Sequence, residues 1–109
     1  MTSRGNLLLY RGITTSMSTK ITNNVAENRY EIDVDGSLGG FAEYRLRNER
    51  VIFTHTEIDP AYEGQGLGGR LARGALDDVR SAGRVAVPLC PFIKAYIDKH
   101  PEYQDLVAD

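Results

Sequence analysis

The 109-residue chain contains one cysteine, no tryptophan and no long hydrophobic run. Because Cys90 is alone, an intramolecular disulfide is excluded, and we expect a reducing, cytoplasmic location. No apolar stretch approaches the length of a membrane span, so we expect no membrane partner. Thirteen lysines and arginines against 15 aspartates and glutamates leave no basic excess. This balance argues against nucleic acid as a partner.

The N-terminal region differs from the rest in composition. Residues 1–26 contain no acidic residue and are rich in Ser and Thr. We expect residues 1–25 to be a disordered extension and residues 26–109 to form one folded domain. An acid-free start with Arg and Ser is also typical of an organelle transit peptide, and Met17 as the true initiator is a further alternative.

Periodicity predicts four strands and two helices in the domain. Alternating or continuous apolar residues predict strands, and apolar residues at helical spacing predict helices. The predicted strands are Arg29–Val34, Gly40–Arg47, Arg50–Ile58 and Arg84–Leu89, and the helices are Leu67–Ala82 and Phe92–Lys99. The order β-β-β-α-β-α predicts an α+β fold with a mixed, mostly antiparallel sheet and helices packed on it. We expect the tail, Gln104–Asp109, to be a helical turn that frays.

Four glycines stand between the third predicted strand and the first predicted helix: Gly64, Gly66, Gly68 and Gly69. Glycine lets backbone N–H groups approach a ligand, and a helix N-terminus adds unpaired donors and partial positive charge. The turn therefore predicts a phosphate or pyrophosphate site. A plain glycine-rich turn that caps a helix is the alternative.

Two familiar phosphate motifs fit this turn poorly. For a P-loop, Arg70 and Leu71 stand where Lys and Ser/Thr are required. For a dinucleotide fold, Gly64, Gly66 and Gly69 satisfy G-x-G-x-x-G. The next strand, however, ends without the acidic residue that would hold the ribose. Too few residues follow for a doubly wound sheet.

The stretch from Ile58 to Gly68, IDPAYEGQGLG, resembles motif A of the GNAT superfamily of acetyl-CoA-dependent N-acetyltransferases. That motif runs Arg/Gln-x-x-Gly-x-Gly/Ala after a strand ending in Val/Ile-x-Pro. Both motif glycines are present, whereas Glu63 stands where Arg or Gln is usual. The stretch from Leu89 to Tyr103, LCPFIKAYIDKHPEY, is similar to the minimal YjdJ-type GNAT-like family. The resemblance runs from about residue 29 to about residue 106 and implies a truncated GNAT fold.

This resemblance implies acetyl-CoA as co-substrate, with its pyrophosphate on the glycine turn. The implied contacts are Ile58, Glu63, Gly64, Gln65, Gly66, Leu67, Gly68, Gly69 and Arg70, with Cys90 and Tyr96 near the thioester. Glu63 adds negative charge beside a phosphate, so it should weaken binding unless its side chain turns outward. Arg70 reaches a CoA phosphate or belongs to a solvated helix face.

Acetylation of an amine needs a base, donors for the thioester oxyanion and an acid for the thiolate. Period-two spacing puts His55 and Glu57 on one strand face, where Glu57 could take the proton and His55 relay it. A polar pair on a solvated face is the alternative. The resemblance implies Tyr96 as the acid, unless it is a core tyrosine. Backbone N–H groups near Ile58 are the expected oxyanion donors.

Cys90 precedes a predicted helix N-terminus, where a thiolate is stabilised. It could accept an acetyl group, line the acyl pocket, or be a small buried apolar residue. His55 and His100 are far apart in sequence, and no Cys/His cluster exists, so no metal is expected.

The resemblance therefore implies an N-acetyltransferase that transfers an acetyl group directly from acetyl-CoA to a small-molecule or protein amine. We expect a monomer or weak dimer. A non-catalytic CoA- or acyl-CoA-binding module or regulator is the first alternative. A small interaction domain without a ligand is the second.

Overall fold

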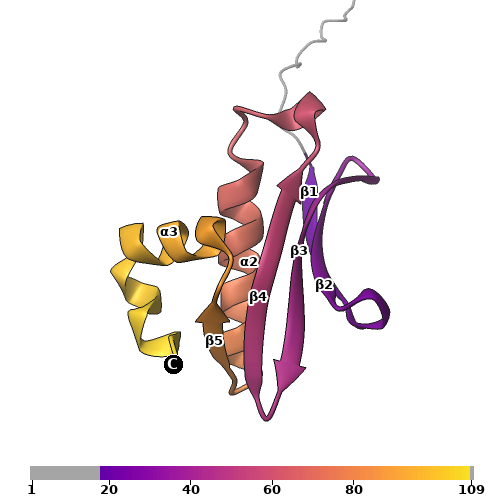
Figure 1. Cartoon of the computed structure of the whole chain (residues 1–109). Coiled ribbons are helices and arrows are strands. Elements are labelled where there is room, and N and C mark those ends of the chain that lie inside the picture. The colour runs from indigo at the N-terminus through magenta and orange to yellow at the C-terminus, as the bar shows by residue number, and fades with distance from the viewer. Residues whose placement is uncertain (1–17, 109) are drawn as a thin grey trace, which may run out of the picture.

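The computed structural model describes residues 18–108; residues 1–17 and residue 109 lie outside the described part. One five-stranded sheet has the order β1-β2-β3-β4-β5 (Figure 1). The strands are β1 (Thr19–Asn24), β2 (Arg29–Val34), β3 (Ser37–Arg47), β4 (Arg50–Ile58) and β5 (Val85–Pro88). The helices are α2 (Leu67–Ser81) and α3 (Pro91–Lys99), with short 3-10 helices η1 (Val25–Glu27), η2 (Pro60–Tyr62) and η3 (Pro101–Leu106). The predicted α+β class with a mixed sheet is confirmed.

Strand pairing is unequal on the two sides of β4. Strands β1 to β4 pair antiparallel in sequence order. After the crossover through α2, β5 pairs parallel with β4, but only Arg50–Phe53 face Val85–Pro88. The last five residues of β4, Thr54 to Ile58, therefore have no partner on the β5 side.

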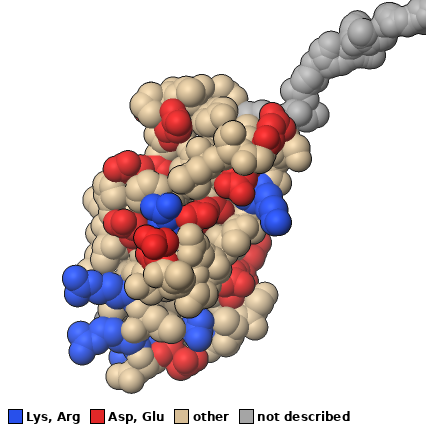
Figure 2. Space-filling view, turned by 90° about the vertical axis from the view of Figure 1, so that its right-hand side faces the viewer, with Lys and Arg blue, Asp and Glu red and all other residues tan. Residues whose placement is uncertain are grey.

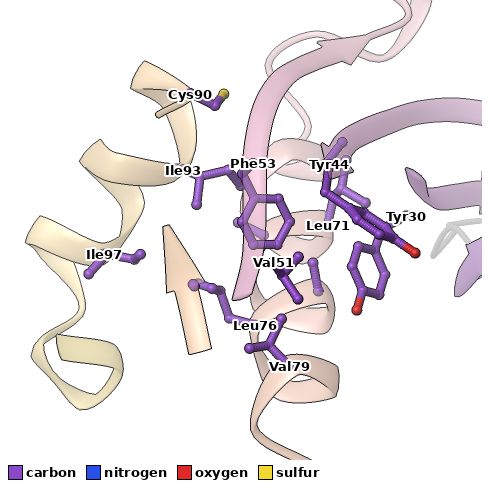
Figure 3. Packing of buried hydrophobic residues seen from close by; sticks show 14 of the residues in the cluster. Tyr30, Tyr44, Val51, Phe53, Leu71, Leu76, Val79, Cys90, Ile93 and Ile97 are labelled. Atoms are coloured by element: carbon purple, nitrogen blue, oxygen red, sulfur yellow. The ribbon is translucent and has the colours of Figure 1, made fainter. Parts of the chain in front are cut away.

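The core lies between α2 and one face of the sheet (Figure 3). Alternate strand residues point into it, as the apolar alternation predicted. Phe53 is fully buried and lies 6.1 Å and 6.4 Å, between ring centroids, from Tyr30 and Tyr44. From α2 the buried side chains are Leu67, Leu71, Ala72, Ala75, Leu76 and Val79. This spacing of three and four residues gives the helix one apolar stripe.

The opposite side of the sheet, here called the open face, carries the residues between the buried ones. It includes Arg29, Glu31, Phe41 and Glu43, which are half-buried. The guanidinium of Arg29 stands 4.6 Å from the centroid of the Phe41 ring, and its Nε lies 2.8 Å from Glu31. Viewed from the side of β1, β2 and β3, acidic side chains predominate in the middle and upper part, with some basic ones among them, and most basic side chains lie toward the lower end (Figure 2).

The predicted domain boundary at residue 26 is wrong, because Thr19–Asn24 form edge strand β1. This strand pairs along its whole length with β2. Its apolar residue Ile21 packs against α2 at Gly74, where Cγ1 of Ile21 stands 2.8 Å from the position a Cβ would take. Because β1 is mostly polar and is held by backbone hydrogen bonds and one apolar contact, its sequence shows little of the apolar alternation that predicts a strand. The remainder of the predicted extension, residues 1–17, lies outside the described residues.

The predicted fraying of the tail is also wrong. Residues 101–106 form η3, which buries Tyr103 and Leu106. Arg80 of α2 bonds both carboxylate oxygens of Asp105 at 2.9 Å. Val107 then makes a parallel bridge with Ala86 of β5. These contacts join segments far apart in sequence, which local patterns do not reveal.

The remaining elements follow the predictions closely. Two strands, Arg29–Val34 and Arg50–Ile58, have the predicted bounds, and the first helix begins at Leu67 as predicted. Strand β3 starts three residues early, at Ser37, and β5 is shorter than predicted. Within residues 18–108, no helix combines the length and apolar character needed to cross a membrane.

We expect Phe53→Ala to lower the free energy of unfolding by about 3–5 kcal/mol, because it leaves a cavity at the centre of the core. Urea denaturation measures the loss. Leu46→Ala is the control: this side chain is 44% exposed, and its loss should stay within about 0.5 kcal/mol. Equal effects of the two substitutions would contradict the assignment of Phe53 to the core.

Candidate functional site

The glycine turn between η2 and α2 has the backbone conformation of an anion cradle. Gly64 and Gly66 have φ of +81° and +76°, a backbone conformation that residues with a side chain rarely adopt. Gly66 is the N-cap of α2 and contributes no side-chain hydrogen bond. The first intrahelical bond runs from the Arg70 N–H to the Gly66 carbonyl. The N–H groups of Leu67, Gly68 and Gly69 therefore have no intrahelical acceptor and are free for a ligand.

The charge around this turn is compatible with an anion. No acidic residue lies in the first turn of α2, so the partial positive charge of the helix N-terminus is not offset there. Glu63 precedes the turn in extended conformation and is exposed. Its backbone N–H bonds the Pro60 carbonyl, which closes η2.

Helix α3 packs against the glycines from the other side. A Cβ on Gly68 would stand 2.6 Å from Cζ of Phe92, so the absence of a side chain there lets the Phe92 ring approach the start of α2. Phe92 is 41% exposed and Leu89 67% exposed. The exposed Phe92 ring thus borders the turn next to its free donors.

A β-bulge divides β4 into two parts. Tyr44 of β3 faces Phe53 and Glu43 faces His55, which leaves Thr54 as an extra residue. Because the extra residue reverses the alternation, His55 and Glu57 lie on the open face, although Val51 and Phe53 lie in the core. Thr56 then points to the helix side.

The free edge of β4 offers backbone donors next to the turn. The N–H of Asp59 bonds the Gly39 carbonyl on the β3 side. Since N–H groups alternate between the two edges of a strand, those of Ile58 and Thr56 point to the β5 side. Strand β5 has already left that edge, because its ladder ends at Phe53 and Pro88. The sequence analysis expected oxyanion donors near Ile58, and their role stays a prediction.

His55 and Glu57 form a close polar pair. Nε2 of His55 lies 3.0 Å from Oε2 of Glu57, and the side chains are 53% and 60% exposed. The predicted proximity of the two residues on one face is present. The pair is accessible from the open face.

Cys90 lies on the other side of β4. It is 2% exposed, and its Sγ stands 3.3 Å from Oγ1 of Thr56. In Figure 3 the sulfur at the start of α3 points toward β4. The N–H of Cys90 bonds the Phe53 carbonyl at 2.9 Å, the point at which β4 and β5 separate. Cys90 and Glu57 are therefore on opposite faces of one strand.

Tyr96 is separate from both Glu57 and Cys90. Its ring stacks on His100 with centroids 3.9 Å apart, and His100 Nδ1 lies 2.8 Å from the Tyr96 carbonyl oxygen. Cε1 of Tyr96 lies 3.8 Å from where a Cβ on Gly69 would be. Six residues of helix separate it from Cys90, about 9 Å along the axis. Burial raises the pKa of the Tyr96 phenol, so it carries its proton at neutral pH.

Arg70 is exposed one turn into α2. Its Nη1 donates to Oγ1 of Thr19 in β1 at 3.4 Å. A hollow of about 340 Å³ between β1 and α2 is lined by Arg70 and Arg73 together with Asp77. The two arginines thus lie on the β1 side of α2, and Asp77 offsets part of their charge.

Thr56 was missed by sequence reasoning, because a threonine in a strand carries no chemical signal without the partner beside it. Only the bulge at Thr54 brings Thr56 to the Cys90 side. Among residues 18–108, no group of three or more His, Cys, Asp or Glu side chains could hold a metal ion.

The fold and the turn together define a class: a small α+β domain with a glycine-rich strand-to-helix turn beside a splayed pair of parallel strands. Residues 29–106 match the family described as GCN5-related N-acetyl-transferase. The chain belongs to this family.

Named relatives and solved structures agree with this family. Protein NATD1 from chicken (Gallus gallus) and from mouse (Mus musculus) are each 34% identical to this chain over 59 residues, which is 53% of this chain. The match spans about half of these relatives, 54% of each.

Two solved structures are similar. A GCN5-like protein from Staphylococcus aureus, determined by NMR, has a TM-score of 0.63 and 25% identity, covering 82% of this chain and 87% of that one. The ribosomal-protein-S18-alanine N-acetyltransferase from Escherichia coli has a TM-score of 0.55 and 18% identity, covering 65% and 49%; this likeness shows the fold alone.

Alanine substitutions at Gly66, in the turn, and at Gly69, in the first turn of α2, should change the free energy of unfolding differently. Gly66→Ala places a side chain at φ +76° and should lower the free energy of unfolding by about 1–2 kcal/mol. Gly69→Ala adds a Cβ at an ordinary 3.8 Å contact in the helix and should be neutral or stabilising by up to about 1 kcal/mol. Urea denaturation of both variants checks this. A stable Gly66→Ala protein would contradict the left-handed conformation of the N-cap.

Proposed function

We propose that this protein transfers an acetyl group from acetyl-CoA to an amine. The observation that carries the proposal is the adjacency of two sets of free backbone donors. One set is at the start of α2, and the other is on the edge of β4 that β5 leaves. The first suits a pyrophosphate and the second a thioester carbonyl. The family of the chain supports acetyl-CoA as the co-substrate.

In this proposal, the CoA pyrophosphate accepts hydrogen bonds from the turn between Glu63 and Arg70. The pantetheine chain passes the apolar side chains of Leu89 and Phe92 toward the free edge of β4. The thioester carbonyl oxygen accepts from the N–H of Ile58, which stabilises the oxyanion as the tetrahedral intermediate forms. The exposed position of Glu63 outside the helix limits its repulsion of the phosphates.

The amine approaches from the open face. Glu57 takes a proton from the ammonium group, with His55 as a relay, and the neutral nitrogen attacks the carbonyl carbon. The carbon–sulfur bond then breaks as the carbonyl re-forms, and the CoA thiolate takes a proton. Tyr96 is the predicted acid, and its raised pKa keeps it protonated. Because the Tyr96 ring stacks on His100, its phenol would protonate the CoA thiolate either after the side chain reorients or through a water molecule.

Cys90 provides a second chemical route. Its thiolate could attack the thioester, release CoA thiolate and then pass the acetyl group to the amine. Its burial and its contact with Thr56 suit a residue that lines the acyl pocket. We propose direct transfer as the main route for this reason.

A CoA-binding module without turnover is the alternative. The stacking of Tyr96 on His100 favours this binding module. Tyr96 lies six residues from Cys90, so no acid would stand beside the sulfur of a CoA thioester bound near Cys90.

We expect acetyl-CoA to shift the backbone amide signals of Gly64, Gly66, Gly68 and Gly69 in a ¹H–¹⁵N titration. Further shifts at Cys90 should appear with acetyl-CoA and be absent with free CoA. Gly36, a turn glycine with φ +89° in the β2–β3 hairpin, serves as the control and should not shift. The absence of any shift at millimolar ligand would overturn the proposed function.

Glu57→Gln should lower kcat/KM by about 100- to 10,000-fold for an amine that the wild type acetylates, because it removes the base. Glu43→Gln is the matched control: it neutralises a carboxylate on the same face, and its activity should change little. Release of CoA thiol measures the rate.

Cys90→Ala separates the two routes in the same assay. Turnover retained by the variant supports direct transfer. Loss of turnover in the variant, together with acetylation of Cys90 in the wild type, would instead support the acyl-enzyme route. Tight acetyl-CoA binding without turnover over a broad amine panel would favour the binding module.

A further inference from the structure

The open face contains a hollow that the CoA proposal does not use. Its volume is about 300 Å³, and it is lined by residues 38–41 at the start of β3 and residues 57–60 at the end of β4. This volume is at the lower end of the range for small-molecule sites. The hollow therefore suits a small compound.

A second irregularity in the sheet shapes this hollow. Ile32 faces Gly40 and Asp33 faces Leu38, so Gly39 is an extra residue in β3. Because directly opposed residues share a face, Leu38 lies on the open face with Asp33. The two glycines are buried and contribute no side chain to the floor. A Cβ on Gly40 would stand 2.7 Å from the Glu57 carbonyl oxygen, so the strands approach closely beneath the hollow.

The hollow is lined by both apolar and acidic side chains. Phe41 lies directly opposite Glu57, and Leu38 is 44% exposed although it is apolar. Glu57 and Asp59 supply two carboxylates. One oxygen of Asp59 accepts from the Ala61 N–H at 2.9 Å, which fixes the orientation of that carboxylate. An apolar wall beside two carboxylates matches a cation attached to an apolar group.

The hollow and the proposed acetyl site share the end of β4. Glu57 and Ile58 line the hollow, while the N–H of Ile58 points to the opposite edge of the strand. A strand is about 4.8 Å wide in the plane of the sheet. An ammonium group at Glu57 would therefore lie about one strand from a thioester at the free edge.

Resting on the proposed function, we propose that this hollow holds the acceptor, a small primary amine with an aromatic or branched aliphatic body. The ammonium group pairs with Glu57 and Asp59, and the body packs on Phe41 and Leu38. The contact with Phe41 and Leu38 favours an amine with an apolar body over an amine without one.

A ¹H–¹⁵N titration of the uniformly labelled protein with 2-phenylethylamine tests this without requiring turnover. We expect saturable shifts at the amides of Gly39, Gly40 and Ala61. The neutral analogue 2-phenylethanol should bind about fivefold more weakly, as should the Glu57→Gln variant, since an exposed ion pair contributes an effect of this size. Phe41→Ala should weaken binding by a similar factor. Glu43→Gln, whose carboxylate lies outside the hollow, should change the affinity by less than about twofold.

Equal binding of the amine and the alcohol, or binding unaffected by both Glu57→Gln and Phe41→Ala, would overturn the proposal. So would shifts at these amides with spermidine but not with 2-phenylethylamine, and so would an absence of shifts with both.

Titration of the same samples with acetyl-CoA distinguishes the two proposals. Shifts at Gly64–Gly69 with acetyl-CoA, without shifts at the hollow with the amine, would reject the acceptor site and keep the proposed function. Shifts at the hollow with the amine, without shifts at Gly64–Gly69 with acetyl-CoA, would reject the proposed function and leave the hollow as an amine-binding site that is not an acceptor site. A dispersed spectrum of each variant shows that it has folded.

Discussion

The single extra residue Thr54 in β4 is the constraint on which the arrangement of the site depends. Before it, Val51 and Phe53 point into the core, where burial of large apolar side chains holds β4 against α2. After it, the alternation is reversed, so Glu57 faces the open side and Thr56 faces Cys90. One strand thus anchors the core and presents different chemistry on its two faces.

The separation of β4 and β5 has a cause on the β5 side. The parallel ladder ends where Phe53 meets Pro88, and Pro88 has no N–H with which to continue it. Cys90 then bonds the Phe53 carbonyl and begins α3, which turns away from the sheet. Backbone groups left unpaired at an edge cost free energy unless water or a ligand pairs with them. A thioester that accepts such a bond uses a feature that the fold already provides.

Much of the framework was predictable because local periodicity and burial agree. Strand Arg29–Val34 alternates strictly, and Leu67, Leu71 and Val79 follow the helical period, so both elements were predicted at nearly their observed bounds. Strand β1 was missed because its stability comes from pairing with β2 and from Ile21 at Gly74. The tail was missed because Tyr103 and Asp105 are held by α2, through Asp77 and Arg80.

The sequence by itself determined the order of the elements from β2 to α3, the glycine turn and its likeness to an acyl-CoA site. These depend on neighbouring residues: glycine is needed where φ is positive, and apolar spacing defines a helix or strand face. Only the tertiary structure decided which face each candidate residue occupies, that Tyr96 stacks on His100, and that a hollow exists beside Glu57. Bulges in β3 and β4 set these positions, and a bulge is a property of two paired strands rather than of either strand alone.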